Sequence, residues 1–321
     1  MAMKFAIGKK AVFYTVIAIL FVGLAIFALS SENEQYTESK EFSVIETRVN
    51  TMDDFTQDLA EDLERAVYIT GVRALNAEIS YIIDEGKFVG NAKLRFNEAF
   101  MNGTVMGRKQ PLMENSTFPD WINRVRTQGA KKGILFNITM KNISIFQISP
   151  WALNVTGYFL ANVTDSANTA KWNRTIKSAV TISILGFEDP IYVVNSYGRV
   201  ANVVRKTPYY RNFTTGHNAT FNPAHLLNHT LEGYYVNNTQ APSFLMRLEN
   251  NFSSSQYGIE SLVNLVELQD QGLNAETKDI VDYIYWGTQN LTSYKINNMP
   301  TWIRIDSSRF GLYMVGGETY S

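Results

Sequence analysis

The residues with the clearest chemical signature in this chain are asparagines in the pattern N-x-S/T, the acceptor sequence for N-linked glycans. Random placement of the 29 asparagines would give roughly four such sequons, yet thirteen are present. This excess predicts an exported, N-glycosylated protein. The predicted acceptors are Asn102, Asn115, Asn137, Asn142, Asn154, Asn162, Asn173, Asn212, Asn218, Asn228, Asn237, Asn251 and Asn290.

Several sequons fall in segments where apolar and polar residues alternate. In residues 153–164 apolar side chains take most of the odd positions, whereas sequon residues take even ones, and similar alternation runs through 136–141 and 173–184. Side chains alternate between the two faces of a strand, so each strand is expected to turn its sequons to solvent, where a bulky glycan fits. The asparagines expected on polar strand faces are Asn137, Asn154, Asn162 and Asn173.

The residues around the sequons indicate which glycosylation machinery is involved. Only Asn251 has an acidic residue two positions earlier, Glu249, and bacterial-type sequons usually require that acid. The chain also has no cysteine, whereas an exported eukaryotic protein of this kind usually carries disulfides. Together the two observations favour an archaeal cell surface.

Residues that could perform catalysis or bind a metal are few. His225 and His229 are four residues apart, so on a helix both could reach one metal ion, but no third ligand is fixed and Asn228 between them is a sequon. Ordinary surface or capping histidines are the alternative interpretation. The nucleophile elbow, the phosphate-binding and dinucleotide-binding loops and the HExxH motif are absent. The sequence therefore predicts no enzyme activity and no cofactor, while carboxylate pairs that assemble only in three dimensions stay open.

Charged residues are scarce and balanced. The 29 basic and 30 acidic side chains give a net charge of −1, which argues against a nucleic-acid partner because phosphate binding requires clustered positive charge. An acidic run from Asp53 to Arg65 is expected to be the solvated face of a helix, since it lacks the glycine and the ligand spacing of an EF-hand. The 17 tyrosines are expected to pack in the core and its rim, with a sugar-stacking or partner surface as the alternative.

The elements that must position the sequons begin with an apolar run. Ala11–Leu29 is a stretch without a charge, and as a helix it spans about 28 Å, close to the hydrocarbon thickness of a bilayer. Residues 1–10 are basic and the residues after the run are acidic, so the N-terminus is expected in the cytoplasm and the rest outside. The sequence predicts a single-pass anchor in the lipid bilayer of the cell membrane. A signal peptide cleaved near Ala28 and Ser30 is the alternative.

A single long helix is expected to continue from the anchor. No proline precedes Pro111 and no glycine lies between Gly23 and Gly71, so one helix is predicted from about Lys10 to Ala74.

The stalk, residues 30–86, carries an apolar stripe at a/d heptad spacing that ends at Ala66. This stripe packs either on a second copy of the chain or on the chain's own domain, and both alternatives are open. The residues proposed for self-association are Phe42, Ile45, Val49, Met52, Leu59 and Leu63.

Residues 87–321 are expected to form an extracellular, glycosylated, antiparallel β-rich domain with a few C-terminal helices, which makes the whole chain an α+β protein. Residues 133–205 predict a meander of strands. Residues 257–287 show helical spacing, interrupted at Gln271–Asn274, and Asn274 is expected to cap the second helix. The end of the domain is expected to be a hairpin formed by residues 302–305 and 310–315.

Two resemblances follow from these segments. The N-terminal segment is basic, then apolar, then amphipathic, and resembles archaeal type IV pilin-like proteins, with Lys10-Ala11-Val12 similar to their processing site. The rest resembles uncharacterised archaeal membrane-anchored surface proteins, which implies a location and not a mechanism. That second resemblance rests on Gly186-Phe-Glu-Asp-Pro-Ile-Tyr192, Ala241-Pro-Ser-Phe-Leu245, Tyr257-Gly-Ile-Glu-Ser-Leu-Val263 and Trp302-Ile-Arg-Ile-Asp306.

The leading hypothesis from the sequence is a membrane-anchored, N-glycosylated cell-surface protein with a structural or interaction role in the envelope. A type IV pilin-like filament subunit is the first alternative. An exported hydrolase is the second.

Overall fold

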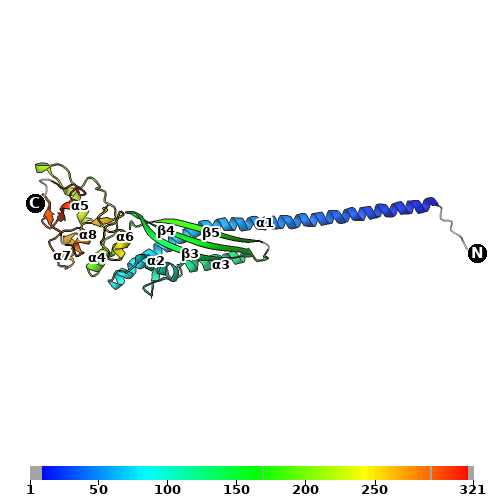
Figure 1. The fold of residues 1–321 in the computed structure, drawn as a ribbon, viewed down its shortest axis with the longest axis horizontal. Helices are drawn as coiled ribbons and strands as arrows, with labels where there is room; N and C mark the ends of the chain where they lie inside the picture. The colour runs from blue at the N-terminus through cyan, green and yellow to red at the C-terminus, as the bar shows by residue number, and fades with distance from the viewer. Residues whose placement is uncertain (1–8, 169, 290, 317–321) are drawn as a thin grey trace, which may run out of the picture.

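The computed structural model describes residues 9–168, 170–289 and 291–316, and it shows a mixed α+β protein (Figure 1). Helix α1, Lys9–Glu85, is a single helix of 77 residues, so the predicted uninterrupted helix is confirmed and continues past Ala74. Its N-terminal half projects away from the rest of the molecule, and its C-terminal half lies against the body (Figure 1). The helix ends where Gly86 takes a left-handed φ of 61°, a conformation that glycine adopts without steric cost.

The other elements are shorter. The helices are α2 (Ala92–Asn102), α3 (Phe118–Lys131), α4 (Pro190–Asn195), α5 (Ala224–Leu231), α6 (Phe244–Leu248), α7 (Leu265–Asp270) and α8 (Asp282–Tyr285), with 3-10 turns η1 (Pro111–Met113), η2 (Asn218–Thr220) and η3 (Ser307–Arg309). The strands are β1 (Thr104–Val105), β2 (Arg108–Lys109), β3 (Ile134–Ser149), β4 (Ala152–Asp165), β5 (Lys171–Ser183), β6 (Tyr235–Asn237), β7 (Ile259–Ser261), β8 (Ser293–Lys295) and β9 (Arg304–Asp306). All strand pairs are antiparallel.

The main sheet has the order β3-β4-β5 and confirms the predicted meander up to Ser183; the remainder of the predicted range 133–205 contains α4 and no further strand of this sheet. Its inner face is apolar, because the alternating pattern turns residues such as Phe136, Val155 and Phe159 to the same side, where they are buried. Two register shifts interrupt the β3–β4 ladder, one between Met140 and Asn142 and one between Gln147 and Ser149.

Helices α1 and α3 cover this inner face. The rings of Phe118 in α3 and Phe159 in β4 have centroids 5.0 Å apart. Gly71 allows α1 to approach the sheet closely, since a Cβ atom there would be 3.0 Å from Cδ1 of Ile182. A capping box of Thr117 and Asp120 fixes the start of α3.

The apolar stripe of α1 packs on the chain's own body from Met52 onward. Met52, Leu59 and Leu63 are buried and belong to one continuous core with the sheet. Ile45 is 49% exposed and Val49 is half-buried, while the side chain of Phe42 lies outside the described residues. Of the two alternatives for the stripe, docking on the chain's own domain is the arrangement in the structure for its C-terminal part.

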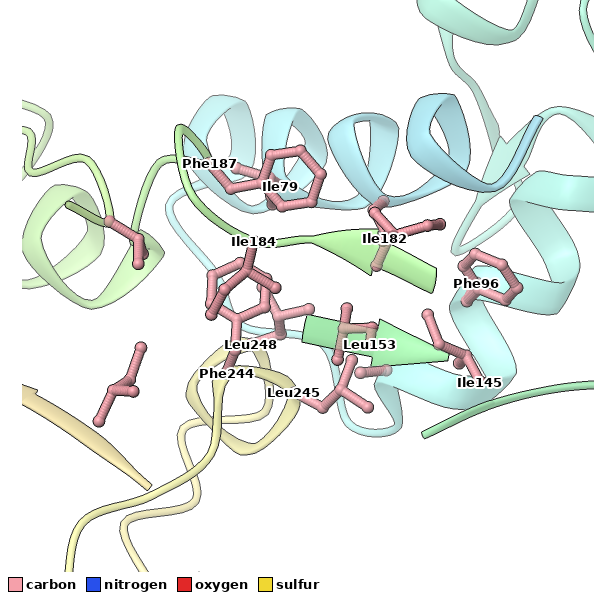
Figure 2. Close-up of a cluster of buried hydrophobic side chains, with 14 of the residues drawn as sticks. Ile79, Phe96, Ile145, Leu153, Ile182, Ile184, Phe187, Phe244, Leu245 and Leu248 are labelled. Carbon is pink, nitrogen blue, oxygen red and sulfur yellow. The ribbon is translucent and has the colours of Figure 1, made fainter. Parts of the chain in front are cut away.

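The body is completed by residues 184–316, which contain only short elements. Figure 2 shows where this region joins the sheet: Phe244 and Leu248 of α6 gather with Leu153, Ile184 and Ile79. All five side chains are buried. The main sheet and the C-terminal region therefore share one hydrophobic core.

The expectation of helices within residues 257–287 is confirmed in part, because α7 and α8 lie there, but the predicted start and cap are wrong. Residues predicted as helix from Ile259 form β7, the intervening helix α7 is capped by Asn264, and Asn274 caps no helix because α8 begins at Asp282. The closing hairpin is also wrong. Strand β9 pairs with β8, and Ser307–Arg309 forms a 3-10 turn instead of a hairpin loop. In both cases pairing with another strand, β6 for β7 and β8 for β9, decides the local conformation.

Within the part of the chain that the structure describes, no helix has a stretch both long and apolar enough to span a bilayer. The side chains of residues 11–17 and 29, which belong to the predicted anchor Ala11–Leu29, lie outside the described residues. The anchor therefore stays a prediction.

Candidate functional site

The strongest candidate site is the outer face of the main sheet, opposite α1 and α3. Polar side chains alternate with the buried ones on all three strands, and none of these strands turns an acidic side chain to this face. Their only acid, Asp165, is buried. The sequons on this face are Asn137, Asn142, Asn154, Asn162 and Asn173.

The predicted orientation of the strand sequons is confirmed. Asn137 and Asn173 are exposed, and Asn154 and Asn162 are half-buried, so none of the four points into the core. The strand register adds an arrangement that the sequence did not reveal. Asn137 lies directly opposite Asn162, which in turn lies opposite Asn173, so three sequons form a row across the sheet.

A second arrangement combines sequons with aromatic rings. Asn142 of β3 lies directly opposite Tyr158 of β4, and Asn154 of β4 lies opposite Phe146 of β3. Tyr158 is 42% and Phe146 40% exposed. Two strand segments of the form N-x-S/T-x-aromatic therefore pair antiparallel. The asparagine of each segment occupies the position directly opposite the aromatic residue of the other.

Positive charge is interspersed on this face. Lys171 and Lys177 of β5 are exposed and share the face with Asn173. The ammonium of Lys177 lies 5.9 Å from the centre of the Tyr158 ring. Arg126 of α3 donates a hydrogen bond of 2.9 Å to the side-chain oxygen of Asn137. The face thus offers amides, hydroxyls, aromatic rings and cations, which is the chemistry of a carbohydrate-bearing or carbohydrate-binding surface.

The other predicted acceptors are spread over the body. Asn237 is half-buried in β6, and the side chains of Asn218 and Asn290 lie outside the described residues. The exposed acceptors away from the sheet are Asn102, Asn115, Asn212, Asn228 and Asn251.

The two candidate metal ligands have separate partners. His225 stacks on Tyr209, with centroids 4.7 Å apart, and its Nδ1 is 2.8 Å from the carbonyl oxygen of Asn212. His229 is fully buried, with Nδ1 3.1 Å from the hydroxyl of Thr207. Burial lowers the pKa of His229 to about 3, so it is neutral at physiological pH. Across residues 9–168, 170–289 and 291–316, no three His, Cys, Asp or Glu side chains are arranged to hold a metal ion.

A buried ionic cluster lies at the centre of the C-terminal region. Arg247, which is fully buried, contacts the carboxylates of both Asp189 and Asp282 at 2.5 Å. Asp189 also accepts from the hydroxyl of Tyr235 at 2.7 Å, and Asp282 from the hydroxyl of Ser261 at 2.7 Å. Burial opposes the charge of Arg247, but the two carboxylates outweigh it and raise its pKa. All three charged side chains are fully buried, so their charges are balanced by one another and not by solvent.

A second buried cluster surrounds Glu260. Its carboxylate accepts from the hydroxyl of Tyr313 at 3.1 Å and from the amide of Asn238 at 2.8 Å, and Arg309 lies 3.7 Å away. Burial raises the pKa of Glu260 to about 7 despite the nearby guanidinium. Like the first cluster, it is shielded from solvent.

Sequence reasoning missed these clusters, although a signal was present. Residues of the two clusters lie in three of the segments on which the resemblance rests. Asp189 lies in residues 186–192 and Glu260 in residues 257–263, and residues 302–306 also contain a cluster residue. Charged residues inside otherwise apolar segments are a sign of buried ionic pairs. Their partners Arg247 and Arg309 are distant in the sequence, so the pairing was not deducible.

A further exposed feature is the N-terminal part of α1. Large apolar side chains there are between 58% and 73% exposed, all around the helix. A helix that is apolar on every side requires an apolar environment or partner. These residues are Ile19, Leu20, Phe21, Val22, Leu24, Ile26 and Phe27.

The chain matches no protein-family model, and neither the curated proteins nor the solved structures contain a match to it.

Proposed function

We propose that this protein is a membrane-anchored, N-glycosylated cell-surface protein with a structural or interaction role, in which a helical stem presents a glycan-bearing sheet to the outside. The observation that carries the proposal is the outer sheet face, where five sequons share one solvent-facing surface. A glycan needs such a surface, because it is too large and too hydrophilic for any packed position.

The N-terminal part of α1 supports the membrane anchor. Its described side chains from Ile19 to Phe27 are apolar and exposed, and they continue the uncharged run that begins at Ala11. In the proposed topology the basic residues before the run stay in the cytoplasm. The helix contacts the body from Arg48 onward, so the stem between Leu29 and Arg48 would hold the body about 28 Å from the membrane.

The two buried ionic clusters do not support the alternative of an exported hydrolase. Asp189, Asp282 and Glu260 are fully buried, and their partners are fixed by hydrogen bonds to neighbouring side chains. A general acid or nucleophile must be within hydrogen-bond reach of substrate. We therefore favour a structural or interaction role over catalysis.

A filament subunit is the second candidate, favoured by one specific observation. The N-terminal half of α1, which contains the apolar run, projects from the body (Figure 1), which is the shape needed to pack many helices into a common core. Membrane retention and assembly could use the same segment at different times. Isolating the protein from membranes or from sheared filaments separates the two candidates.

The first prediction tests location and modification together. The full chain would be produced in an archaeal host that N-glycosylates exported proteins, and intact cells would be treated with added protease. We expect the protease to degrade the body, and mass spectrometry of glycopeptides to find glycans on exposed sequons such as Asn137 and Asn173. The matched control for the glycan mapping is Thr139→Ala, which changes an exposed residue and removes the sequon of Asn137.

Two results would contradict the proposal. One is a body that stays protected until the cells are lysed, because that places it inside. The other is a complete lack of glycans on the exposed asparagines of a chain that has reached the surface.

A further inference from the structure

The pairing of Asn142 with Tyr158 and of Asn154 with Phe146 is symmetric. The centre of this symmetric pairing is Ser144 opposite Thr156. These two residues are the hydroxyl residues of the two sequons. On this outer face each described aromatic side chain, Phe146 or Tyr158, therefore stands directly opposite a glycan acceptor.

Tyr158 is 42% exposed and lies between Lys177 of β5 and Asn142 of β3, the residues paired with it on the two neighbouring strands. Lys177 approaches the ring from β5, with its ammonium 5.9 Å from the ring centre. On the other side of Tyr158, in β3, Asn142 is the directly paired residue. Side chains at directly paired positions have Cβ atoms only about 5 Å apart, so the first sugar on Asn142 would stand beside the ring.

Phe146 and Asn154 are paired in the same way, so the ring of Phe146 lies beside the position of a sugar on Asn154. The ring is 40% exposed on a face where polar neighbours predominate, and β3 is a marginal strand in the order β3-β4-β5. The hydroxyl of Thr156 donates to the side-chain oxygen of Asn154 at 2.6 Å. This bond occupies the oxygen of the amide, whereas a glycan is attached through the nitrogen.

The chemistry of the two partners is complementary. The face of an aromatic ring is negative, and a pyranose ring presents a face of weakly positive C–H groups. We propose that the first sugar of the glycan on Asn142 stacks on Tyr158 and that the first sugar on Asn154 stacks on Phe146, so that these two glycans are part of the folded structure. This inference rests on the glycosylation proposed above.

The row Asn137–Asn162–Asn173 provides the contrast. Each of these asparagines faces another asparagine across the ladder, so no aromatic ring is available at the paired position. Glycans on this row project into solvent without a stacking partner. Removing one of them is accordingly the control for removing a stacked glycan.

The test is a double-mutant cycle on the full glycosylated chain in detergent. Ser144→Ala removes the Asn142 sequon, and Tyr158→Ala removes the ring. We expect Ser144→Ala to lower the melting temperature by about 1–3 °C when Tyr158 is present and by clearly less in the Tyr158→Ala chain. Tyr158→Phe keeps the ring and should preserve the shift.

Two controls isolate the glycan. Thr139→Ala, which removes the sequon of Asn137 on the same strand, should give the same small shift with and without Tyr158. The cycle repeated in a host without N-glycosylation measures the contribution of the Ser144 hydroxyl itself. The coupling between positions 144 and 158 should disappear there.

The outcomes separate this inference from the proposed function. Glycans on other sequons with a bare Asn142 overturn the stacking at Tyr158 and leave the proposed function standing. An occupied Asn142 whose removal has the same effect with and without Tyr158 also overturns it. If no sequon of the exported chain is occupied, both the inference and the proposed function fail.

Discussion

Arg247 illustrates how this protein keeps charges in its interior. Its guanidinium is divided between Asp189 and Asp282, and both carboxylates receive further hydrogen bonds from a hydroxyl group. Removing one member of such a buried group leaves the others uncompensated, which typically costs about 3–5 kcal/mol. The cluster thereby ties together segments that have little regular secondary structure.

Glu78 is the opposite case, a buried acid in α1 without this support. Its side chain is fully buried, and within the described residues neither carboxyl oxygen has a hydrogen-bond partner. Burial raises its pKa well above the usual value, Glu249 raises it further, and Arg95 only partly opposes them. The folded chain therefore holds a proton that the unfolded chain releases above pH 4.5.

Replacing Glu78 by Gln should stabilise the protein at neutral and alkaline pH. A raised pKa in the folded state means that stability falls as pH rises from 4.5 toward the folded pKa, and Gln removes this loss. We expect the free energy of unfolding to increase at pH 8 and to be unchanged near pH 4.

The exposed Glu64→Gln on the same helix is the control for the Glu78 measurement and should have little effect at either pH. An equal effect of Glu78→Gln at pH 4 and pH 8 would show that the carboxyl does not titrate as described.

At the scale of elements, the helix α1 and the main sheet were predictable and the C-terminal elements were not. The absence of helix breakers defined α1, and alternation defined β3, β4 and β5, because each pattern extends over many residues. Ile259 was assigned to a helix because it belongs to a short run with helical spacing. In the structure β7 pairs with β6, a contact that no local pattern encodes.

The candidate site was predictable to the same extent. Alternation placed the strand sequons on the outer face, but the partners across the ladder depend on register. The register shift beside Asn142 moves that residue to the outer face, opposite Tyr158. A bulge of this kind has no reliable sequence signature, so the asparagine–aromatic pairs could not be deduced from the sequence.

Substitutions in the two parts of the apolar stripe of α1 should differ in their effect on the free energy of unfolding. Leu59→Glu places a charge at a position that is 2% exposed and should destabilise the fold by about 3 kcal/mol or more. Ile45→Glu changes a position that is 49% exposed and should alter the free energy of unfolding by less than about 0.5 kcal/mol.

Both stripe variants are compared by thermal unfolding of the full chain in detergent. If the stem associates with a second copy, Ile45→Glu should weaken that association while the fold is kept. Equal destabilisation by the two substitutions would mean that the packed surface of α1 extends beyond Met52 toward the N-terminus and includes Ile45.

At the scale of the whole molecule, the direction of the stem is set where α1 leaves the body. Arg48 donates from Nε to Asp165 at 2.7 Å, from Nη1 to the carbonyl of Lys132 at 3.1 Å and from Nη2 to that of Gly133 at 2.7 Å. One side chain thus connects the helix to the loop before β3 and to the end of β4. Three contacts from a single guanidinium fix both position and orientation.

Arg48→Ala should loosen the base of the stem. We expect faster proteolytic cleavage between Ser43 and Thr51 and a loss of about 1–3 kcal/mol in stability, because the charge-assisted bonds disappear. The control is Arg65→Ala on the same helix, whose partner Asp62 is 3.5 Å away at an exposed site and whose removal should change neither quantity. Unchanged cleavage in Arg48→Ala would show that packing alone holds the stem.

The order β3-β4-β5 leaves two long strands at the margins of the main sheet. Strands at a margin can recruit strands of neighbouring molecules and start aggregation, a serious hazard for proteins crowded on a surface. Here β3 is distorted by two register shifts, and β5 carries Lys171, Arg174 and Lys177, features that obstruct strand addition. These features therefore oppose the merging of the sheets of neighbouring copies into one continuous ribbon.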